Sequence, residues 1–180
     1  MASTFVAGAD TRTIDWSIAL VAGIVAMIVF AVIEIAFSWA VRGAAPLRPL
    51  VVYGTATLNA VMPSVHPGGG PKTAIVGVVC LLALGAASGI ILAYVVDRIG
   101  IVAAAIAGAV FGLAMYAVDL YGVARLLTSL VALRDWMSAL AYVIQGALAA
   151  ALYKIMTRDD AVPIADNAHD LRNLRHAPLM

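Results

Sequence analysis

Residues 100–123 read GIVAAAIAGAVFGLAMYAVDLYGV, and Asp119 is the single charged residue in this stretch. A helix rises about 1.5 Å per residue, so a run of this length extends far enough to cross about 30 Å of hydrocarbon. The stretch therefore predicts a membrane-spanning helix. An aspartate inside such a helix costs about 2.5–3.5 kcal/mol on insertion scales. Asp119 therefore needs a partner, a position near the membrane surface, or both.

Three further apolar runs, at about residues 16–41, 73–96 and 136–156, are also long enough to span. Trp16, Trp39 and Trp136 lie at their ends, where tryptophan commonly sits at the level of the lipid headgroups. The first run is too long for the apolar part of a cleavable signal peptide, which is about 7–15 residues, so we expect it to be a permanent span. These features predict an all-α integral membrane protein. Residues 1–156 would form a compact bundle of four transmembrane helices, and residues 157–180 a polar tail.

The connection between the first two spans, residues 42–72, contains a stretch that is apolar but too short to cross a membrane, LVVYGTATLNAVM at 50–62. We expect a short interfacial or re-entrant helix there, and a covering loop is the alternative. The breaker cluster HPGGGP at 66–71 cannot be helical throughout.

Composition excludes several classes of function. The chain has 180 residues, of which 64% are hydrophobic and 12% charged, whereas soluble domains are about 45–50% apolar and about 25% charged. A net charge of +1 gives no reason to expect a nucleic-acid partner. One cysteine, and three histidines that all lie in polar stretches, predict no metal site and no cofactor. We find no catalytic motif and no sign of a soluble substrate, so the chain is expected not to be an enzyme.

Glu34 and Asp119 are expected near the same membrane face, because the first and third spans run in the same direction and each acid lies close to the end of its span. With Gln145 of the fourth span they form a predicted intramembrane polar cluster. Possible charge partners at that face are Arg42, Arg125 and His66. The acids could be interhelical anchors or a proton or ion site, and the sequence leaves both readings open.

Small residues recur at spacings that bring membrane helices close together, as in Gly108-x-x-x-Gly112 and Gly85-x-x-x-Gly89. Because offsets of four, seven and eleven residues return to one helix face, Gly108, Gly112 and Asp119 share a stripe. The predicted helix-packing residues are Gly23, Gly85, Gly89, Gly108, Gly112 and Gly146.

Four spans would place both termini on one side of the membrane. Lysines and arginines are almost evenly divided, with six on the side of the termini and five on the other. We expect the termini in the cytoplasm, following the slight excess.

The segments GAVFGLAMYAVDLYGVARLL (108–127) and LRDWMSALAYVIQGALAAALYK (133–154) resemble a family of small bacterial four-helix membrane proteins catalogued as "sodium:proline symporter". The resemblance is best over residues 100–156 and extends loosely to the first span. It implies a four-helix architecture in a bacterial inner membrane. In this family asparagine is common at the position of Asp119 and histidine at that of Tyr142, so the chain departs from the pattern at both. Sodium–solute symporters with inverted repeats have spans broken near the midplane, whereas the prolines here lie in connectors and the tail.

The leading functional expectation is a non-catalytic accessory or structural subunit of a larger membrane protein complex, such as a respiratory or other redox assembly. Small-residue faces on the spans, an apolar connector and the lack of a catalytic motif support it. Its partners would be the lipid bilayer and other membrane subunits. The alternative is a small oligomeric transporter or proton-linked carrier that uses Glu34 and Asp119.

Overall fold

The computed structural model describes residues 14–64 and 68–159, and every regular element in these ranges is helical. The α-helices are α1 (Trp16–Ala40), α2 (Arg48–Val61), α3 (Pro71–Val96), α4 (Ile101–Ala117) and α5 (Trp136–Asp159). Four segments are long and apolar enough to cross a membrane, namely α1, α3, α5 and the run Ile101–Arg125 that begins with α4. The prediction of an all-helical chain with four apolar spans is confirmed, and it indicates a multi-pass membrane protein.

The ends of the spans differ slightly from the predicted ones. Helix α3 begins at Pro71 rather than near residue 73. Proline fits the first turn of a helix, because the N–H that it lacks would have no partner within the helix there. Helix α5 continues to Asp159, three residues past the predicted end. Most of the predicted polar tail, from residue 160 onward, lies outside the described residues.

An aspartate starts the first helix. The Asp15 carboxylate accepts hydrogen bonds from the backbone N–H groups of Ser17 and Ile18, at 3.0 and 3.1 Å. These satisfy donors that a helix N-terminus leaves unpaired. The hydrogen bond from the Ser17 hydroxyl, together with the backbone bonds, holds the pKa of Asp15 below its usual range.

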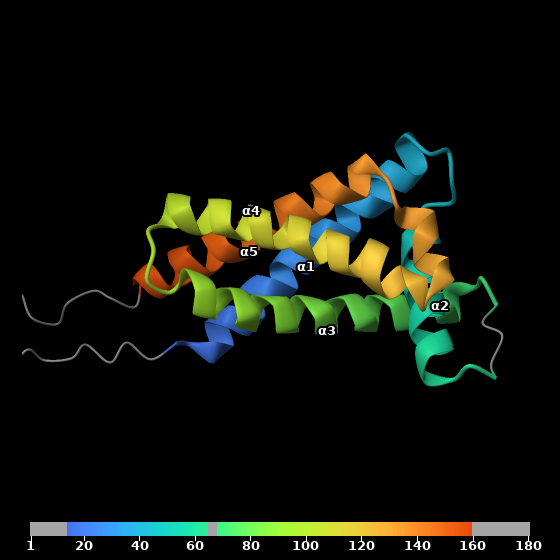
Figure 1. The fold of residues 1–180 in the computed structure, drawn as a ribbon, viewed down its shortest axis with the longest axis horizontal. Coiled ribbons are helices and arrows are strands. Elements are labelled where there is room, and N and C mark those ends of the chain that lie inside the picture. The colour runs from blue at the N-terminus through green and yellow to red at the C-terminus, as the bar shows by residue number, and fades with distance from the viewer. Residues whose placement is uncertain (1–13, 65–67, 160–180) are drawn as a thin grey trace, which may run out of the picture.

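The helices are arranged with α3 and α4 along the long axis of the molecule and α1 and α5 crossing them obliquely (Figure 1). The most extensive contact joins α4 and α5, followed by α1 with α3 and α2 with α3, and α1 also contacts α5. Both described chain ends lie at one end of the molecule, and α2 lies at the other (Figure 1).

Glycines allow the main helix contacts to form through the backbone. A Cβ placed on Gly23 would collide with the carbonyl oxygen of Gly85, and one on Gly108 would collide with that of Gly146. A Cβ on Gly112 would meet the Tyr142 carbonyl. The structure therefore places the predicted packing glycines at the α1–α3 and α4–α5 contacts, where small residues bring membrane helices together.

The connector between the first two spans contains α2, which crosses α3 where Gly54 and Gly77 meet. Leu50, Tyr53 and Ala56 form its buried face. The α2 helix packs on the chain's own α3.

The third span does not end as a regular α-helix. After Ala117 it widens into a π-helical turn, η1 (Val118–Gly122), followed by two 3₁₀ turns, η2 (Val123–Arg125) and η3 (Thr128–Leu133). The Leu120 carbonyl accepts a hydrogen bond from Nε of Arg134 at 2.9 Å. The same guanidinium lies over the Tyr121 ring, 4.3 Å from its centroid. Arg134 thus secures the widened turn that carries Asp119, and single π-turns of this kind are frequent at functional sites.

Replacing Gly112 with alanine is expected to lower the free energy of unfolding by about 1–3 kcal/mol, the usual cost of overpacking. The added methyl would push α4 away from the α5 backbone at Tyr142. Thermal unfolding in detergent, followed by circular dichroism, measures the effect. Gly122→Ala is the matched control, because nothing lies within 4 Å of a Cβ built there. Equal midpoints for the two variants would contradict the close approach of α4 and α5.

Candidate functional site

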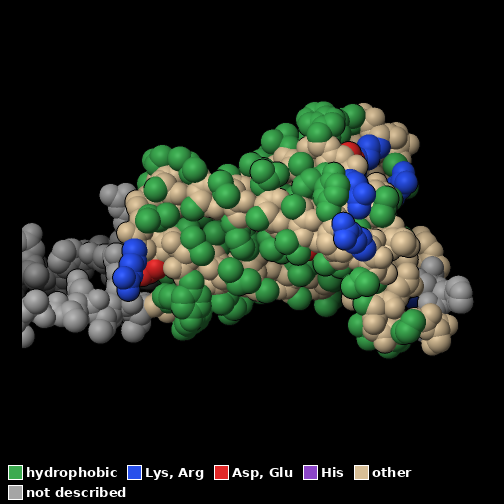
Figure 2. Space-filling view, in the orientation of Figure 1, with side chains coloured by type: hydrophobic (Ala, Val, Ile, Leu, Met, Phe, Trp, Pro, Cys, Tyr) green, Lys and Arg blue, Asp and Glu red, His purple; other side chains and the backbone are tan. Residues whose placement is uncertain are grey.

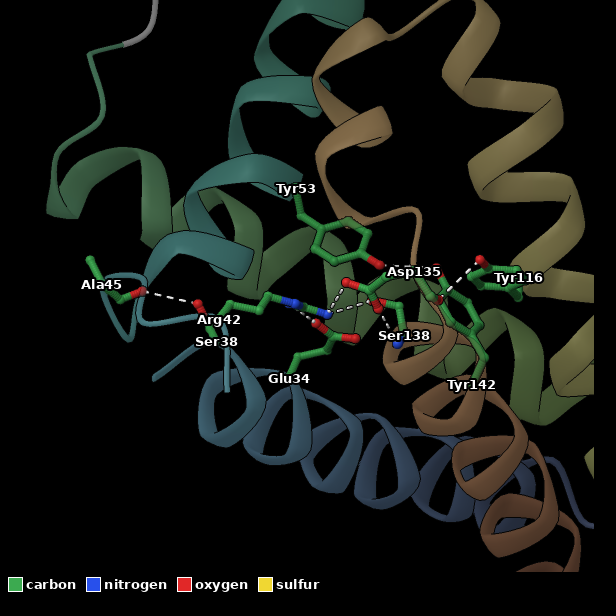
Figure 3. A network of polar contacts seen from close by, with 9 residues as sticks. All are labelled: Glu34, Ser38, Arg42, Ala45, Tyr53, Tyr116, Asp135, Ser138 and Tyr142. Atoms are coloured by element: carbon green, nitrogen blue, oxygen red, sulfur yellow. Dashed lines mark hydrogen bonds and ion pairs between the residues drawn. The ribbon is translucent and has the colours of Figure 1, made fainter. Parts of the chain in front are cut away.

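A charged cluster at the α2 end of the molecule is centred on Arg42, just after α1 (Figure 3). Its Nη1 lies 3.1 Å from Oε2 of Glu34, and its Nη2 lies 2.7 Å from Oδ2 of Asp135. Nη2 also donates a hydrogen bond to the Ser138 hydroxyl at 3.1 Å. One guanidinium therefore bridges an acid of α1 and the start of α5.

Local backbone geometry places Arg42 and Asp135 for this contact. The Arg42 N–H closes the end of α1 by donating to the Phe37 carbonyl, and Gly43 then turns the chain with a φ of 61°, a conformation that favours glycine. At the start of α5, Oδ1 of Asp135 accepts the backbone N–H of Ser138 at 2.8 Å. Asp135 is thus an N-terminal cap whose second oxygen remains available to Arg42.

Burial makes the Glu34–Arg42 pair interdependent. Glu34 is only 1% exposed, and an unpaired carboxylate at such a site would be strongly unfavourable. Burial lowers the pKa of the Arg42 guanidinium, but the hydrogen bond from Arg42 to Asp135 and the nearby Glu34 charge outweigh it and raise that pKa overall. Oε1 of Glu34 and Nε of Arg42 are buried without a hydrogen-bond partner in the described part of the chain.

A second set of polar groups, the hydroxyl chain, contains Asp119, Tyr142 and Tyr53. The Tyr142 hydroxyl donates to Oδ2 of Asp119 at 2.8 Å and lies 3.0 Å from the Tyr53 hydroxyl. The hydroxyl chain therefore links the π-helical turn, α5 and α2. Burial raises the pKa of the Tyr53 phenol well above its ordinary value.

Aromatic rings hold the hydroxyl chain beside the charged cluster. The Phe30 ring packs edge-on against Tyr142, with centroids 4.8 Å apart, and Tyr116 packs against Tyr142 at 5.9 Å. The Tyr116 hydroxyl donates to the Asp135 carbonyl at 3.1 Å, which connects the two sets (Figure 3). Rings and hydrogen bonds together fix the orientation of Tyr142.

Gln145 makes a separate interhelical bond. Its amide nitrogen donates to the Ser88 hydroxyl on α3 at 3.3 Å, and that hydroxyl donates to the Gly85 carbonyl. Gln145 and Asp119 nevertheless line one small cavity among the spans, where the space open to a water centre is about 10 Å³. This is room for about one water molecule.

The predicted acids share one end of the molecule but have different partners. Glu34 pairs with Arg42, as the sequence allows, whereas Asp119 accepts a hydrogen bond from a tyrosine and contacts no cation among the described residues. Arg125 is exposed and makes no ion pair within residues 14–64 and 68–159, so the structure does not bring it to either acid. Asp119 lies in η1 and Arg125 at the end of η2. His66 lies outside the described residues.

Sequence reasoning missed Asp135, Ser138 and Tyr53. Asp135 and Ser138 have the spacing of a helix cap, D-x-x-S, directly before the fourth span, and this signal could have identified the cap. Tyr53 gave no local signal, because its contact with Tyr142 depends on how α2 crosses α3.

The arrangement is chemically suited to fixing helices and to holding protons at defined oxygens. Glu34 is bonded to Arg42, Arg42 also to Ser138 of α5, and Asp119 to Tyr142 of α5. In the described part of the chain, no group of three or more His, Cys, Asp or Glu side chains could hold a metal ion.

Replacing Asp119 with asparagine is expected to be mild, because the side-chain oxygen can still accept the Tyr142 hydroxyl. Asp119→Leu should lower stability more, since it leaves that hydroxyl with only its Tyr53 contact. Interhelical hydrogen bonds in membranes average about 0.6 kcal/mol and reach about 1.7 kcal/mol, so neither variant should prevent folding. Thermal unfolding in detergent ranks them. A neutral or stabilising Asp119→Leu would show that the hydroxyl chain does not hold the helices together.

Comparisons with known proteins leave the site to be interpreted from its geometry. No protein-family model matches the chain, and searches of curated proteins and of solved structures found no match. The likeness to small four-helix bacterial membrane proteins stays a prediction from the sequence.

Proposed function

We propose that this chain is a non-catalytic accessory or structural subunit of a larger complex in a bacterial cytoplasmic membrane, such as a respiratory or other redox assembly. In this proposal the four long helices span the bilayer as one compact bundle, and α2 lies at the membrane interface. The observation that carries it is that the interior acids are bonded to the chain's own helices, so the outer surface is the part available for a function.

The filled interior supports this reading. Where the helices meet, glycines bring the backbones into direct contact at α1–α3 and at α4–α5. The cavity beside Asp119 has room for about one water molecule. A solute larger than water has no space at that point.

The outer face of α4 is the surface best suited to a partner subunit. The span from Ile101 to Arg125 has the smallest buried share of the four, 17% against 33–39%. Large aliphatic side chains project from it at helical spacing, with exposures of 51–71%: Val102, Ile106, Val110 and Leu113. A partner helix could cover this face without displacing any intramolecular contact.

The structure changes one argument for a partner. From the sequence, small-residue faces suggested contacts with other subunits, but in the structure the predicted glycines pack within the chain. The proposal of a partner subunit is therefore supported by the exposed aliphatic face of α4 and no longer by the small-residue faces. We also propose that both termini are cytoplasmic, and the described chain ends lie at one end of the molecule (Figure 1).

Purification of the tagged full chain from its native membrane in mild detergent tests the subunit role. The protein should migrate with a partner well above its own 18.6 kDa plus detergent. Ile106→Trp on α4 should release the partner, whereas Val79→Trp on α3, at an equal exposure of 62%, should not. Migration of the wild-type chain alone would contradict the proposal.

A second candidate is a small oligomeric, proton-linked carrier. The observation that favours it is the buried Oε1 of Glu34, which has no donor in the described part of the chain, close to the hydroxyl chain that ends at Asp119. Buried intramembrane acids mark proton pathways in many transporters.

Proton flux into liposomes that contain the purified protein tests this candidate. If the acids carry protons, the Glu34→Gln/Asp119→Asn double variant should abolish flux, while Asp97→Asn, at the opposite end of the molecule, should not. No wild-type flux, or flux unchanged in the double variant, would exclude the acids from such a mechanism.

A further inference from the structure

The α2 end of the molecule carries basic side chains that no described acid neutralises (Figure 2). Arg42 is paired with Glu34 and Asp135, and Arg134 is bonded to the Leu120 carbonyl. Arg48 and Lys72 are exposed and form no ion pair with any residue in 14–64 or 68–159. These two cations lie near the start of α2 and the start of α3.

An open hollow, the head groove, lies directly beside Arg48. Its volume is about 420 Å³, within the range of about 300–1,000 Å³ typical of ligand sites. The segment before α2 and its first turn form one wall, and the start of α3 forms the other. Among the described residues, Arg48 is the one charged residue that lines the head groove. The other lining residues include Leu47, Val51, Gly70, Pro71 and Ala74.

A second hollow, the tail groove, lies next to the first. On α3, Val78 of the tail groove follows Ala74 of the head groove by one helical turn. On α2, Leu50 lines the tail groove and the next residue, Val51, lines the head groove. Its volume is about 180 Å³, and its lining is entirely apolar, with α1 forming the facing wall through Ile28, Val32 and Ile35.

Bonds within the chain hold the head groove open. The Ser38 hydroxyl donates to the Ala45 carbonyl at 3.2 Å, and the Arg48 N–H donates to the same carbonyl at 2.9 Å. The backbone contact of Gly54 with Gly77 fixes α2 on α3. The site is therefore largely formed before any ligand arrives, as ligand sites usually are.

We propose that the two grooves bind one anionic phospholipid, with its phosphate at Arg48 and an acyl chain in the tail groove. Charge selects the headgroup, because unpaired cations at a membrane surface attract anionic lipids. The apolar tail groove selects a lipid over a free phosphate, which would leave that surface uncovered. The site rests on the membrane location of the chain and is independent of the subunit role.

Native mass spectrometry of the full chain in detergent, with equal amounts of phosphatidylglycerol and phosphatidylcholine that carry identical acyl chains, tests the site. The wild type should retain the anionic lipid preferentially. Arg48→Gln should reduce that preference about fivefold, the approximate worth of one basic residue near an anionic surface. The control, Arg125→Gln, removes the same charge from a residue that lines neither groove and should leave the preference unchanged.

Val78→Trp, which fills the tail groove, should reduce retention of both lipids, and Ile28→Trp on the facing wall should repeat the effect if the first variant unfolds. Both positions are partly exposed, at 39% and 50%. Equal retention of the two lipids by the wild type would overturn the proposal. So would an equal loss in Arg48→Gln and Arg125→Gln, or unchanged retention in a folded tail-groove variant.

Discussion

A carboxylate buried among membrane-spanning helices needs a cation or strong donors beside it, and Arg42 supplies the cation for Glu34. The same guanidinium holds Asp135, the cap of α5, and so ties the end of α1 to the start of α5. That link brings Phe30 of α1 against Tyr142 of α5, and Tyr142 in turn reaches Asp119 and Tyr53. The polar cluster and the helix crossing at this end thus depend on each other.

The rest of the molecule relies on glycine in place of charge. Backbone contacts at Gly23–Gly85 and Gly108–Gly146 bring the spans so close that little interior space remains. The proposed structural role therefore places the contacts of the chain with a partner on its outer surface. Apolar side chains of α4 offer that surface to protein, whereas the grooves beside α2 combine charge with an apolar lining and suit a lipid.

Much of this fold could be predicted because hydrophobic length and glycine spacing are local signals. They indicated the four spans and the contacts of Gly108 and Gly112. The partner of Asp119 could not be predicted, because it depends on the π-helical turn and on the distant Tyr142. Arg125, six residues from Asp119 in sequence, was one of three possible charge partners, but it lies exposed at the end of η2. The contact of Tyr53 with Tyr142 likewise depends on how α2 crosses α3 and could not be predicted.

The most direct test of this account is a double-mutant cycle on Arg42 and Glu34, measured as free energies of unfolding in detergent. Arg42→Gln should cost about 3 kcal/mol, because it leaves the Glu34 carboxylate buried without its cation. Adding Glu34→Gln should recover a large part of that loss, since the neutral amide needs no counter-charge. If the double variant instead lost the sum of the two single losses, Arg42 and Glu34 would not act as a pair, and the central claim would be wrong.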